Sequence, residues 1–199
     1  MNIISNNCLG GYIYRNILQD SYKNPFIWTL FENPSEYIDL IENWNNVDFD
    51  DFIMTRKGKG LKNNFQILID SKYTVSFIHI FFDPVKDNTQ YFENTPRIVG
   101  ENIFTPKPWE YITEKYVQRL DRMKKETNTV FFYFEPNISC SDLIRLPSVL
   151  ATNKFRGVIF TDNSKVVGNS YATVLPALGL DLPSKICNHY RQEIFNICK

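Results

Sequence analysis

The chain opens with the stretch that decides its fold, Met1-Asn2-Ile3-Ile4-Ser5-Asn6-Asn7-Cys8-Leu9-Gly10-Gly11-Tyr12-Ile13-Tyr14-Arg15. Ile3 and Ile4 indicate a short apolar strand, a polar cluster follows it, and two glycines precede a segment with helical spacing of apolar residues. This order predicts a first strand, a tight turn and a first helix. The turn would hold a hydroxyl, two carboxamides and a thiol where strand becomes helix.

The rest of the chain continues to alternate between strands and helices. Asn33 can cap a helix that has Pro34 at its first position and Glu36 three residues after the cap. Such alternation is typical of a parallel sheet with helical crossovers. The short Asp70-Ser71-Lys72 segment favours an antiparallel hairpin between the strands on either side of it. We therefore predict a three-layer α/β fold: a mostly parallel mixed sheet with helices on both faces and one antiparallel hairpin. After a first helix at 11–18, the expected strands are 25–31, 65–69, 73–80, 129–134, 157–161 and 171–178, and the expected helices are 34–44, 108–126, 141–146 and 183–199.

Length and composition limit the possibilities further. With 199 residues, 43% of them apolar and 15% aromatic, the chain is expected to form a single α/β domain over 1–199. Residues 83–108 are rich in Asp, Asn, Thr and Pro and predict a long loop of the kind that often covers a functional site. The charges of the 22 basic and 22 acidic residues cancel, and neither sign forms a long block. This pattern excludes non-specific binding of nucleic acid through a basic surface.

The sequence also predicts where the protein resides. It shows no apolar run long enough for a transmembrane segment, and its first residues lack the pattern of a secretory signal. We therefore expect a cytoplasmic protein, and leave its oligomeric state open. Its four cysteines, Cys8, Cys140, Cys187 and Cys198, form no C-x-x-C pair, so a zinc site is not expected and no metal ligands are assigned. A cytosolic chain keeps such thiols reduced.

Polar side chains follow several predicted strands at their carboxyl ends, where ligands collect in open parallel sheets. We expect these side chains to converge in one crevice. They are Ser5, Asn6, Asn7 and Cys8 after the first strand, His79 at the end of a later one, Glu135 with Asn137 after 129–134, and Asp162 with Asn163 after 157–161.

Cys8 has a physical case for reactivity. It precedes a helix N-terminus, where unpaired N–H groups and the helix dipole favour a thiolate. With His79 as base, and Asp162 or Glu135 orienting the imidazole, the arrangement would resemble a catalytic triad. The alternatives stay open: Cys8 as a small residue that fills a tight turn, and His79 as a neutral, hydrogen-bonded core histidine.

Two further features could bind an anion. The N–H groups of Gly10 and Gly11 could hold an oxyanion or a phosphate. Lys115, Arg119 and Arg122 recur on one face of the helix at 108–126. This stripe is either a solvated flank or a pair of guanidinium groups suited to phosphate or carboxylate. The sequence contains no G-x-S-x-G, no G-x-G-x-x-G and no nucleotide P-loop.

The stretch from Ser5 to Tyr14 resembles the opening signature of a bacterial family of unknown function. Members of that family are often described as exopolysaccharide biosynthesis proteins, and they occur in loci for capsule or cell-surface polysaccharides. The resemblance covers roughly residues 2–162. It implies a three-layer α/β fold and a cytoplasmic link to surface glycans, and it supplies no established reaction.

Later parts of the chain are also similar to that family. A capped helix follows the second strand, a later strand ends in a histidine (Phe77, His79), and Trp109 shares a long helix with Arg119 and Arg122. The chain departs from the family at Leu9, where members often carry an aromatic residue, and at Glu135, near which they often carry an aspartate.

These observations favour an enzyme that modifies a surface-polysaccharide precursor. The first interpretation is acyl transfer, with Cys8 as nucleophile, His79 as base and Asp162 as orienting carboxylate. The donor would be an acyl-coenzyme A or a sugar nucleotide. Glycosyl transfer is an alternative that does not need the thiol, and a non-catalytic protein that binds a nucleotide-sugar or a glycan is another. The expected substrate-binding residues are Ser5, Asn6, Asn7, Gly10, Gly11, Tyr14, Arg119, Arg122 and Glu135.

Overall fold

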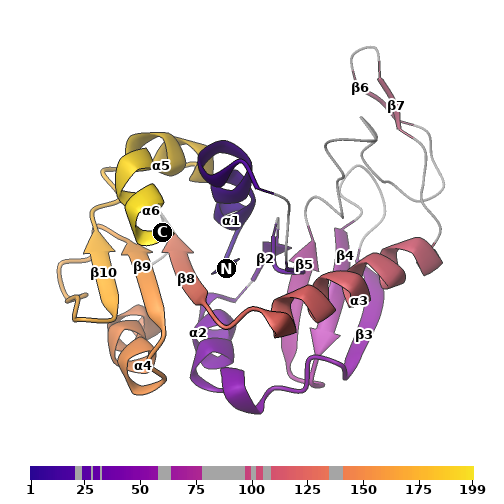
Figure 1. Ribbon diagram of the computed structural model, residues 1–199, viewed down its shortest axis with the longest axis horizontal. Coiled ribbons are helices and arrows are strands. Elements are labelled where there is room, and N and C mark those ends of the chain that lie inside the picture. Colours follow the sequence, from indigo (N-terminus) through magenta and orange to yellow (C-terminus); the bar gives the residue numbers. More distant parts are fainter. Residues whose placement is uncertain are drawn as a thin grey trace.

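A computed structural model describes residues 1–20, 24–27, 29–31, 33–57, 64–77, 97–99, 102–104, 109–134 and 141–199 (Figure 1). Its strands are β1 (Asn2–Ser5), β2 (Thr29–Leu30), β3 (Phe52–Lys57), β4 (Asn64–Ile69), β5 (Tyr73–Phe77), β6 (Arg97–Val99), β7 (Asn102–Phe104), β8 (Thr129–Phe134), β9 (Arg156–Phe160) and β10 (Ala172–Leu175). Its α-helices are α1 (Leu9–Tyr12), α2 (Pro34–Glu42), α3 (Trp109–Lys125), α4 (Leu146–Thr152), α5 (Pro183–His189) and α6 (Arg191–Ile197). A π-helix, η1 (Ile13–Leu18), continues α1, and the described residues also include two 3₁₀ helices, η2 (Trp44–Asn46) and η3 (Ser141–Arg145).

The parallel sheet, sheet A, has the strand order β1-β8-β9-β10. Ile3 pairs with Val130 and Phe132 with Val158, so the first strand of the chain lies beside the apolar run at 129–134. β8 has neighbours on both sides and its side chains from Val130 to Phe134 are buried, as expected for a central parallel strand covered on both faces.

Helices cover both faces of sheet A because its apolar side chains alternate between them. Ile3, Val130 and Phe160 belong to a core shared with α1, η1, α5 and α6, and Ile4, Phe131 and Ile159 belong to a core shared with α2 and α4. Figure 1 shows α1, α5 and α6 above the strands and α2 and α4 below them. The predicted α/β fold with a parallel sheet and helices on both faces is therefore confirmed.

The antiparallel strands form a sheet of their own, sheet B, with the order β2-β5-β4-β3. The predicted hairpin is present as β4 and β5, which turn through Asp70 and Ser71 at φ values of 53° and 48°. Sheets A and B meet near the end of β1, where Phe31 N donates to Asn6 O at 3.0 Å. The mixed character of the fold thus comes from two adjoining sheets.

Some elements differ in extent from those predicted. The strand expected at 25–31 is reduced to β2, because Phe26 N donates to Asn24 Oδ1 and the Thr29 hydroxyl to Phe26 O, which makes a turn. The helix expected at 183–199 is broken at Tyr190, whose φ of −101° and ψ of 28° separate α5 from α6. Inside the loop predicted at 83–108, β6 and β7 form a short antiparallel hairpin.

Candidate functional site

The turn between β1 and α1 is built by its own polar side chains. Asn7 Oδ1 accepts a hydrogen bond from Leu9 N at 3.0 Å, and Ser5 Oγ accepts one from Gly10 N at 2.9 Å. The Ser5 hydroxyl donates in turn to Asn7 O at 2.5 Å. A Cβ on Gly10 would lie 2.9 Å from Ser5 Oγ, so this close approach of α1 to β1 requires glycine. Ser5 and Asn7 therefore satisfy the first amides of α1 from within the protein.

The two asparagines also fasten the turn to the end of β8. Asn6 Nδ2 donates to Phe134 O at 3.1 Å, and Phe134 N donates to Asn6 Oδ1 at 2.9 Å. Asn7 Nδ2 donates to the same Phe134 carbonyl at 2.5 Å. The Asn6 side chain is only 2% exposed. Through its two bonds with Phe134, the carboxamide pairs as a strand residue would and extends the pairing of β1 with β8.

Tyr14 protects the outer edge of β1. Its hydroxyl accepts from Ile3 N at 3.1 Å and from Asn24 Nδ2 at 3.2 Å, and donates to Met1 O at 2.9 Å. Asn24 Nδ2 also donates to Ile3 O at 3.0 Å, so a backbone donor and acceptor of this edge strand are paired. Burial raises the pKa of the Tyr14 hydroxyl well above its ordinary value. The structure therefore uses this tyrosine to complete the sheet.

Cys8 is the N-cap of α1 and is half-buried at the margin of the core beneath α1 and α5. Burial raises the pKa of its thiol to about 12, and a hydrogen bond with its own backbone lowers it only in part. Desolvation is thus the larger of the two effects on the pKa. At neutral pH the thiol is protonated, so a nucleophilic role would depend on a base that removes the proton. The proposed base, His79, lies outside the described residues.

Asp162 follows β9 at the same carboxyl-end edge, where it holds a turn. Its carboxylate accepts hydrogen bonds from Leu178 N at 2.9 Å and Gly179 N at 3.1 Å. These bonds hold the pKa of Asp162 below its usual range. The exposed carboxylate therefore connects the end of β9 to the segment after β10.

The predicted basic pair lies elsewhere. α3 packs across sheet B, where Tyr116 contacts Phe52, and the carbonyl of Met123 in its last turn accepts from Asn2 at the amino end of β1. Arg122 is exposed beside Met123, and Arg119, one turn earlier, is only 6% exposed. Arg122 is thus near the edge of sheet A opposite to Cys8. Glu135, like Asn137, lies outside the described residues.

The carboxyl ends of β1, β8, β9 and β10 share one edge because all these strands are parallel. The chain leaves β1 toward α1 on one face of sheet A, and the next helices after β8, η3 and α4, pack on the other face. The position between β1 and β8 is therefore a topological switch point, the usual ligand position in open α/β sheets. The structure brings Ser5, Asn6, Asn7, Cys8 and Gly10 to it, and Gly11 follows inside α1.

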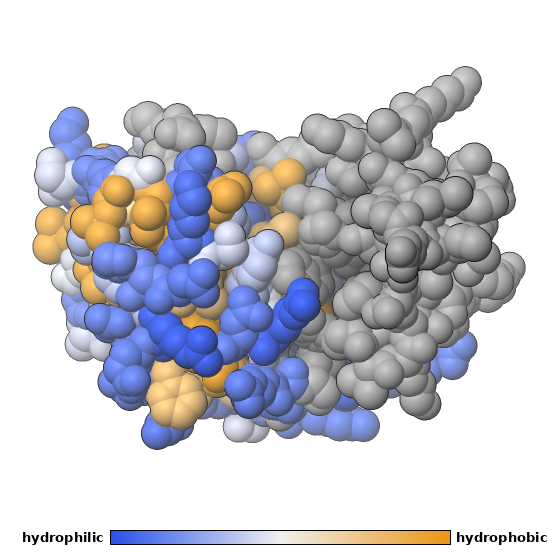
Figure 2. All heavy atoms as spheres, turned by 90° about the horizontal axis from the view of Figure 1, so that it is seen from above, coloured by the Kyte–Doolittle hydropathy of each residue, from blue (hydrophilic) through white to orange (hydrophobic). Residues whose placement is uncertain are grey.

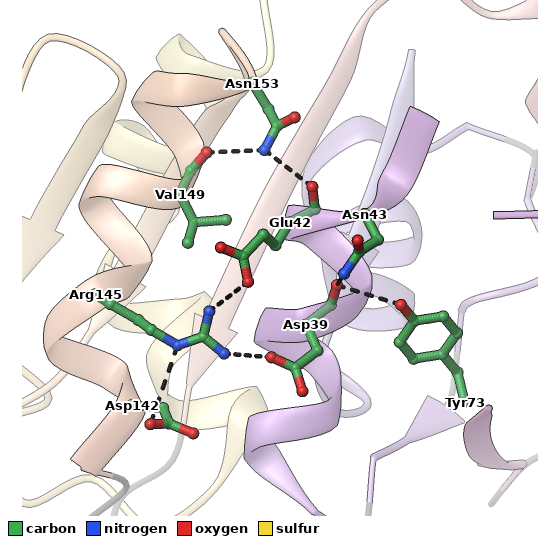
Figure 3. Close-up of polar contacts among 8 residues, drawn as sticks. All are labelled: Asp39, Glu42, Asn43, Tyr73, Asp142, Arg145, Val149 and Asn153. Carbon is green, nitrogen blue, oxygen red and sulfur yellow. Dashed lines mark hydrogen bonds and ion pairs between the residues drawn. The ribbon is translucent and has the colours of Figure 1, made fainter. Parts of the chain in front are cut away.

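Arg145 is a structural residue that the sequence did not reveal (Figure 3). Its guanidinium donates to Glu42 Oε2 at 2.7 Å and to the carboxylate of Asp39, and lies 4.0 Å from Asp142. These ion pairs tie η3 and α4 to α2 beneath sheet A. In the sequence, only the i, i+3 spacing of Asp142 and Arg145 indicates an ion pair. The partners on α2 are about a hundred residues away, so no local pattern indicates them.

Comparison with protein families decides the family. A model described as "Domain of unknown function (DUF1919)" matches residues 1–161. The chain belongs to the DUF1919 family. The match ends at the residue after β9, so β10, α5 and α6 lie beyond the DUF1919 region. No curated protein and no solved structure matches the chain.

Two properties of this DUF1919 chain concern ligands and membranes. Within the described residues, no three His, Cys, Asp or Glu side chains gather where they could share a metal ion. Among the helices in the same ranges, none combines the length and apolar character needed to cross a bilayer.

Proposed function

We propose that this protein binds a sugar nucleotide at the carboxyl-end edge of sheet A and transfers the sugar to a surface-polysaccharide precursor. The observation that carries the proposal is the switch point between β1 and β8, with α1 and α4 on opposite faces. Nucleotides bind at this position in open α/β sheets. The link to surface glycans comes from the resemblance of the N-terminal signature.

The state of Cys8 favours glycosyl transfer over acyl transfer. A thiol with a pKa of about 12 is a poor nucleophile at neutral pH, because the thiolate is the reactive form. In glycosyl transfer an acceptor hydroxyl forms the bond to C1 of the sugar, while the bond from C1 to the diphosphate oxygen breaks. The hydroxyl proton passes to a base, and the nucleoside diphosphate leaves. None of these steps needs a thiolate.

The residues of the turn divide into two roles in this proposal. Ser5 and Asn6 are buried and bonded within the protein, so they position the turn. Asn7 and Cys8 are half-buried and border the edge, so they are the side chains that can touch a bound ligand. Asn7 keeps the turn in place through Leu9 and Phe134 while it does so.

Thermal unfolding with candidate donors tests the proposal. Sugar nucleotides should raise the unfolding midpoint of the wild type and of Cys8→Ser alike, because a ligand that prefers the folded state stabilises it. Cys8→Ser should also retain sugar transfer to a glycan acceptor. Stabilisation by acyl-coenzyme A but not by sugar nucleotides, with loss of activity in Cys8→Ser, would establish acyl transfer instead.

A further inference from the structure

We propose that β3 pairs with β3 of a second copy of this chain, which continues sheet B across a twofold axis. β3 is the outer strand of sheet B and bonds β4 on one side only (Figure 1). Asp70 N donates to Asp51 O at 2.8 Å, so alternate residues of β3 from Asp51 onward bond β4. Phe52 and Met54 therefore direct their backbone N–H and C=O groups outward, and within the described ranges no residue bonds these groups.

The other outer strands of sheets A and B are covered by groups of the same chain. The Tyr14 hydroxyl bonds the edge of β1, and β2 is followed by Phe31, whose N–H bonds the end of β1. At β10, Asn169 N donates to Ala172 O at 3.0 Å, and Asn169 Oδ1 accepts from Ala172 N at 2.9 Å. Proteins cover strand edges because a free edge pairs readily with another strand. The open edge of β3 is therefore the exception, and it is available for a second strand.

Ile53 gives this edge an apolar side chain on the face of sheet B away from α3. α3 packs on the other face, where the rings of Tyr116 and Phe52 lie with their centroids 4.5 Å apart. Successive side chains of a strand alternate between the two faces of a sheet, so Ile53 points away from α3. It is 53% exposed. A free edge that exposes an aliphatic side chain in this way is a ready template for another strand.

Val117 borders the same edge on the α3 face. α3 runs beside β3 in the opposite direction. Thr113 Oγ1, near the start of α3, lies 3.5 Å from Met54 Sδ, and Lys124, near its end, forms an ion pair with Asp50 just before β3. Val117 follows Thr113 by one turn and lies on the same side of the helix, the side toward β3. It is 40% exposed, so a second copy at this edge would bury it.

The sequence of β3 is complementary to itself in one antiparallel register. When Ile53 faces Ile53 of the second copy, Phe52 of each copy exchanges both backbone bonds with Met54 of the other. The two Ile53 side chains then form a non-hydrogen-bonded pair, in which side chains approach most closely. In the same register Asp50 comes opposite Arg56 at each end, so an acidic position faces a basic one. A second copy therefore fits this edge in backbone bonding, apolar contact and charge, as a twofold interface requires.

Exposed apolar side chains at the other end of the molecule lack such an arrangement. Val167 lies between β9 and β10, and Leu178 and Leu182 lie between β10 and α5. Figure 2 shows apolar residues interspersed with hydrophilic ones at the end that holds β10 and α5. The edge of β10 beside them is covered by Asn169, so an apolar border and a free strand edge do not coincide there.

Sedimentation velocity of the whole chain over a series of concentrations tests the inference. The wild type should shift from monomer to dimer as the concentration rises. Ile53→Lys and Ile53→Glu should each remain monomeric over the same series, because like charges would face each other at the axis. An equimolar mixture of the two variants should form dimers again, since opposite charges then face each other. The matched control is Val167→Lys, which replaces a 73% exposed apolar side chain between β9 and β10 and should dimerise like the wild type.

Cysteine substitution tests the register of the two strands. In a non-hydrogen-bonded pair the Cα atoms lie about 4.5 Å apart, a separation that a disulfide can span. With oxidised glutathione as the oxidant, Ile53→Cys should form a covalent dimer on a non-reducing gel. Val167→Cys should remain a monomer under the same conditions.

A wild type that stays monomeric, or an Ile53→Lys variant that dimerises like the wild type, would overturn the pairing of β3 with a second copy. So would an equal loss of dimer in Val167→Lys, because exposed apolar area in general would then be responsible. A mixture of the Lys and Glu variants that stays monomeric, or an Ile53→Cys chain that does not cross-link, would overturn it as well. Circular dichroism checks that each variant is folded, as expected for substitutions at exposed side chains.

Discussion

At the scale of single residues, the protonation state of Cys8 distinguishes acyl transfer, which needs a thiolate, from glycosyl transfer, which does not. Its folded-state pKa of about 12 means that the thiol loses its proton only at high pH. We predict that iodoacetamide alkylates Cys8 about a thousandfold more slowly at pH 8 than it alkylates an exposed cysteine. Mass spectrometry of the Cys8 peptide across a pH series gives the rate, with urea-unfolded protein as the control. A midpoint near the free-thiol value of about 8.5 would restore the nucleophile interpretation.

Asn6 makes the sharpest structural prediction at this scale. Asn6→Ala leaves the buried N–H of Phe134 without its side-chain acceptor and removes one of the two side-chain donors to the Phe134 carbonyl, which keeps its bond from Asn7 Nδ2. We expect the free energy of unfolding to fall by about 2–4 kcal/mol. Urea denaturation measures it, and Asn196→Ala on the exposed surface of α6 should change stability by less than about 0.5 kcal/mol. Equal effects of the two substitutions would show that Asn6 does not fasten β1 to β8.

At the scale of elements, a substitution at the start of α5 should raise the stability of the protein. Leu182→Ser supplies the missing N-cap, so the free energy of unfolding should rise by about 0.5–1 kcal/mol. Leu182→Ala removes the same exposed side chain without adding a cap and should give no such rise. If serine and alanine behave alike, α5 does not begin with an unsatisfied cap.

The α2–α4 contact depends on Arg145, whose partners are all partly exposed. Arg145→Met should lower the free energy of unfolding by about 1–2 kcal/mol at low salt, and by less in high salt, because exposed pairs are weak and screened. Lys185→Met breaks the exposed pair with Asp181 and should have almost no effect. A loss at Arg145 that does not respond to salt would point to packing of its methylene groups instead.

The predicted and observed elements also differ in a consistent way: local features were predictable from the sequence and long-range contacts were not. The caps and periodicities of α2 and α3 are local, so sequence predicted them well, and the Asn33 cap is present with Ser35 N 3.1 Å from Asn33 Oδ1. Glu36 was expected to complete a capping box, yet its carboxylate accepts from Thr74 N on β5 at 3.1 Å. The Tyr14 hydrogen bonds to β1 and the Arg145 ion pairs join distant segments of the chain. The separation of sheets A and B also depends on contacts between distant segments. Local sequence patterns do not encode such contacts.

The candidate site was predictable to a similar extent. The Ser5-Asn6-Asn7-Cys8 turn and the carboxyl end of β9 lie at one edge of sheet A, a position that follows from sequence because parallel strands share their carboxyl ends. The sequence left two interpretations of Cys8 open, a nucleophile and a small residue that fills the turn. Burial, which raises the pKa of the thiol to about 12, depends on how α5 packs over the turn and is not encoded locally. The internal use of the Ser5 and Asn6 side chains likewise required the position of β8.

At the scale of the whole molecule, the segment after residue 161 packs into the core of sheet A although the DUF1919 match ends there. Ile186, Tyr190 and Ile194 share a core with Ile3, Val158 and Phe160. A chain ending at Thr161 would expose this face of sheet A to water. We predict that it shows no cooperative thermal transition by circular dichroism, while the full chain does. A cooperative transition in the shortened chain would mean that β10, α5 and α6 are an accessory.

We propose above that a sugar nucleotide binds at the carboxyl-end edge of sheet A. The most direct test is calorimetric titration of sugar nucleotides into Cys8→Tyr, which places a bulky side chain at that edge, and into Asn128→Tyr, which places one just before β8 at the opposite edge. Circular dichroism checks that both variants are folded. We expect Asn128→Tyr to bind like the wild type and Cys8→Tyr to lose binding. Undiminished binding by folded Cys8→Tyr would contradict it.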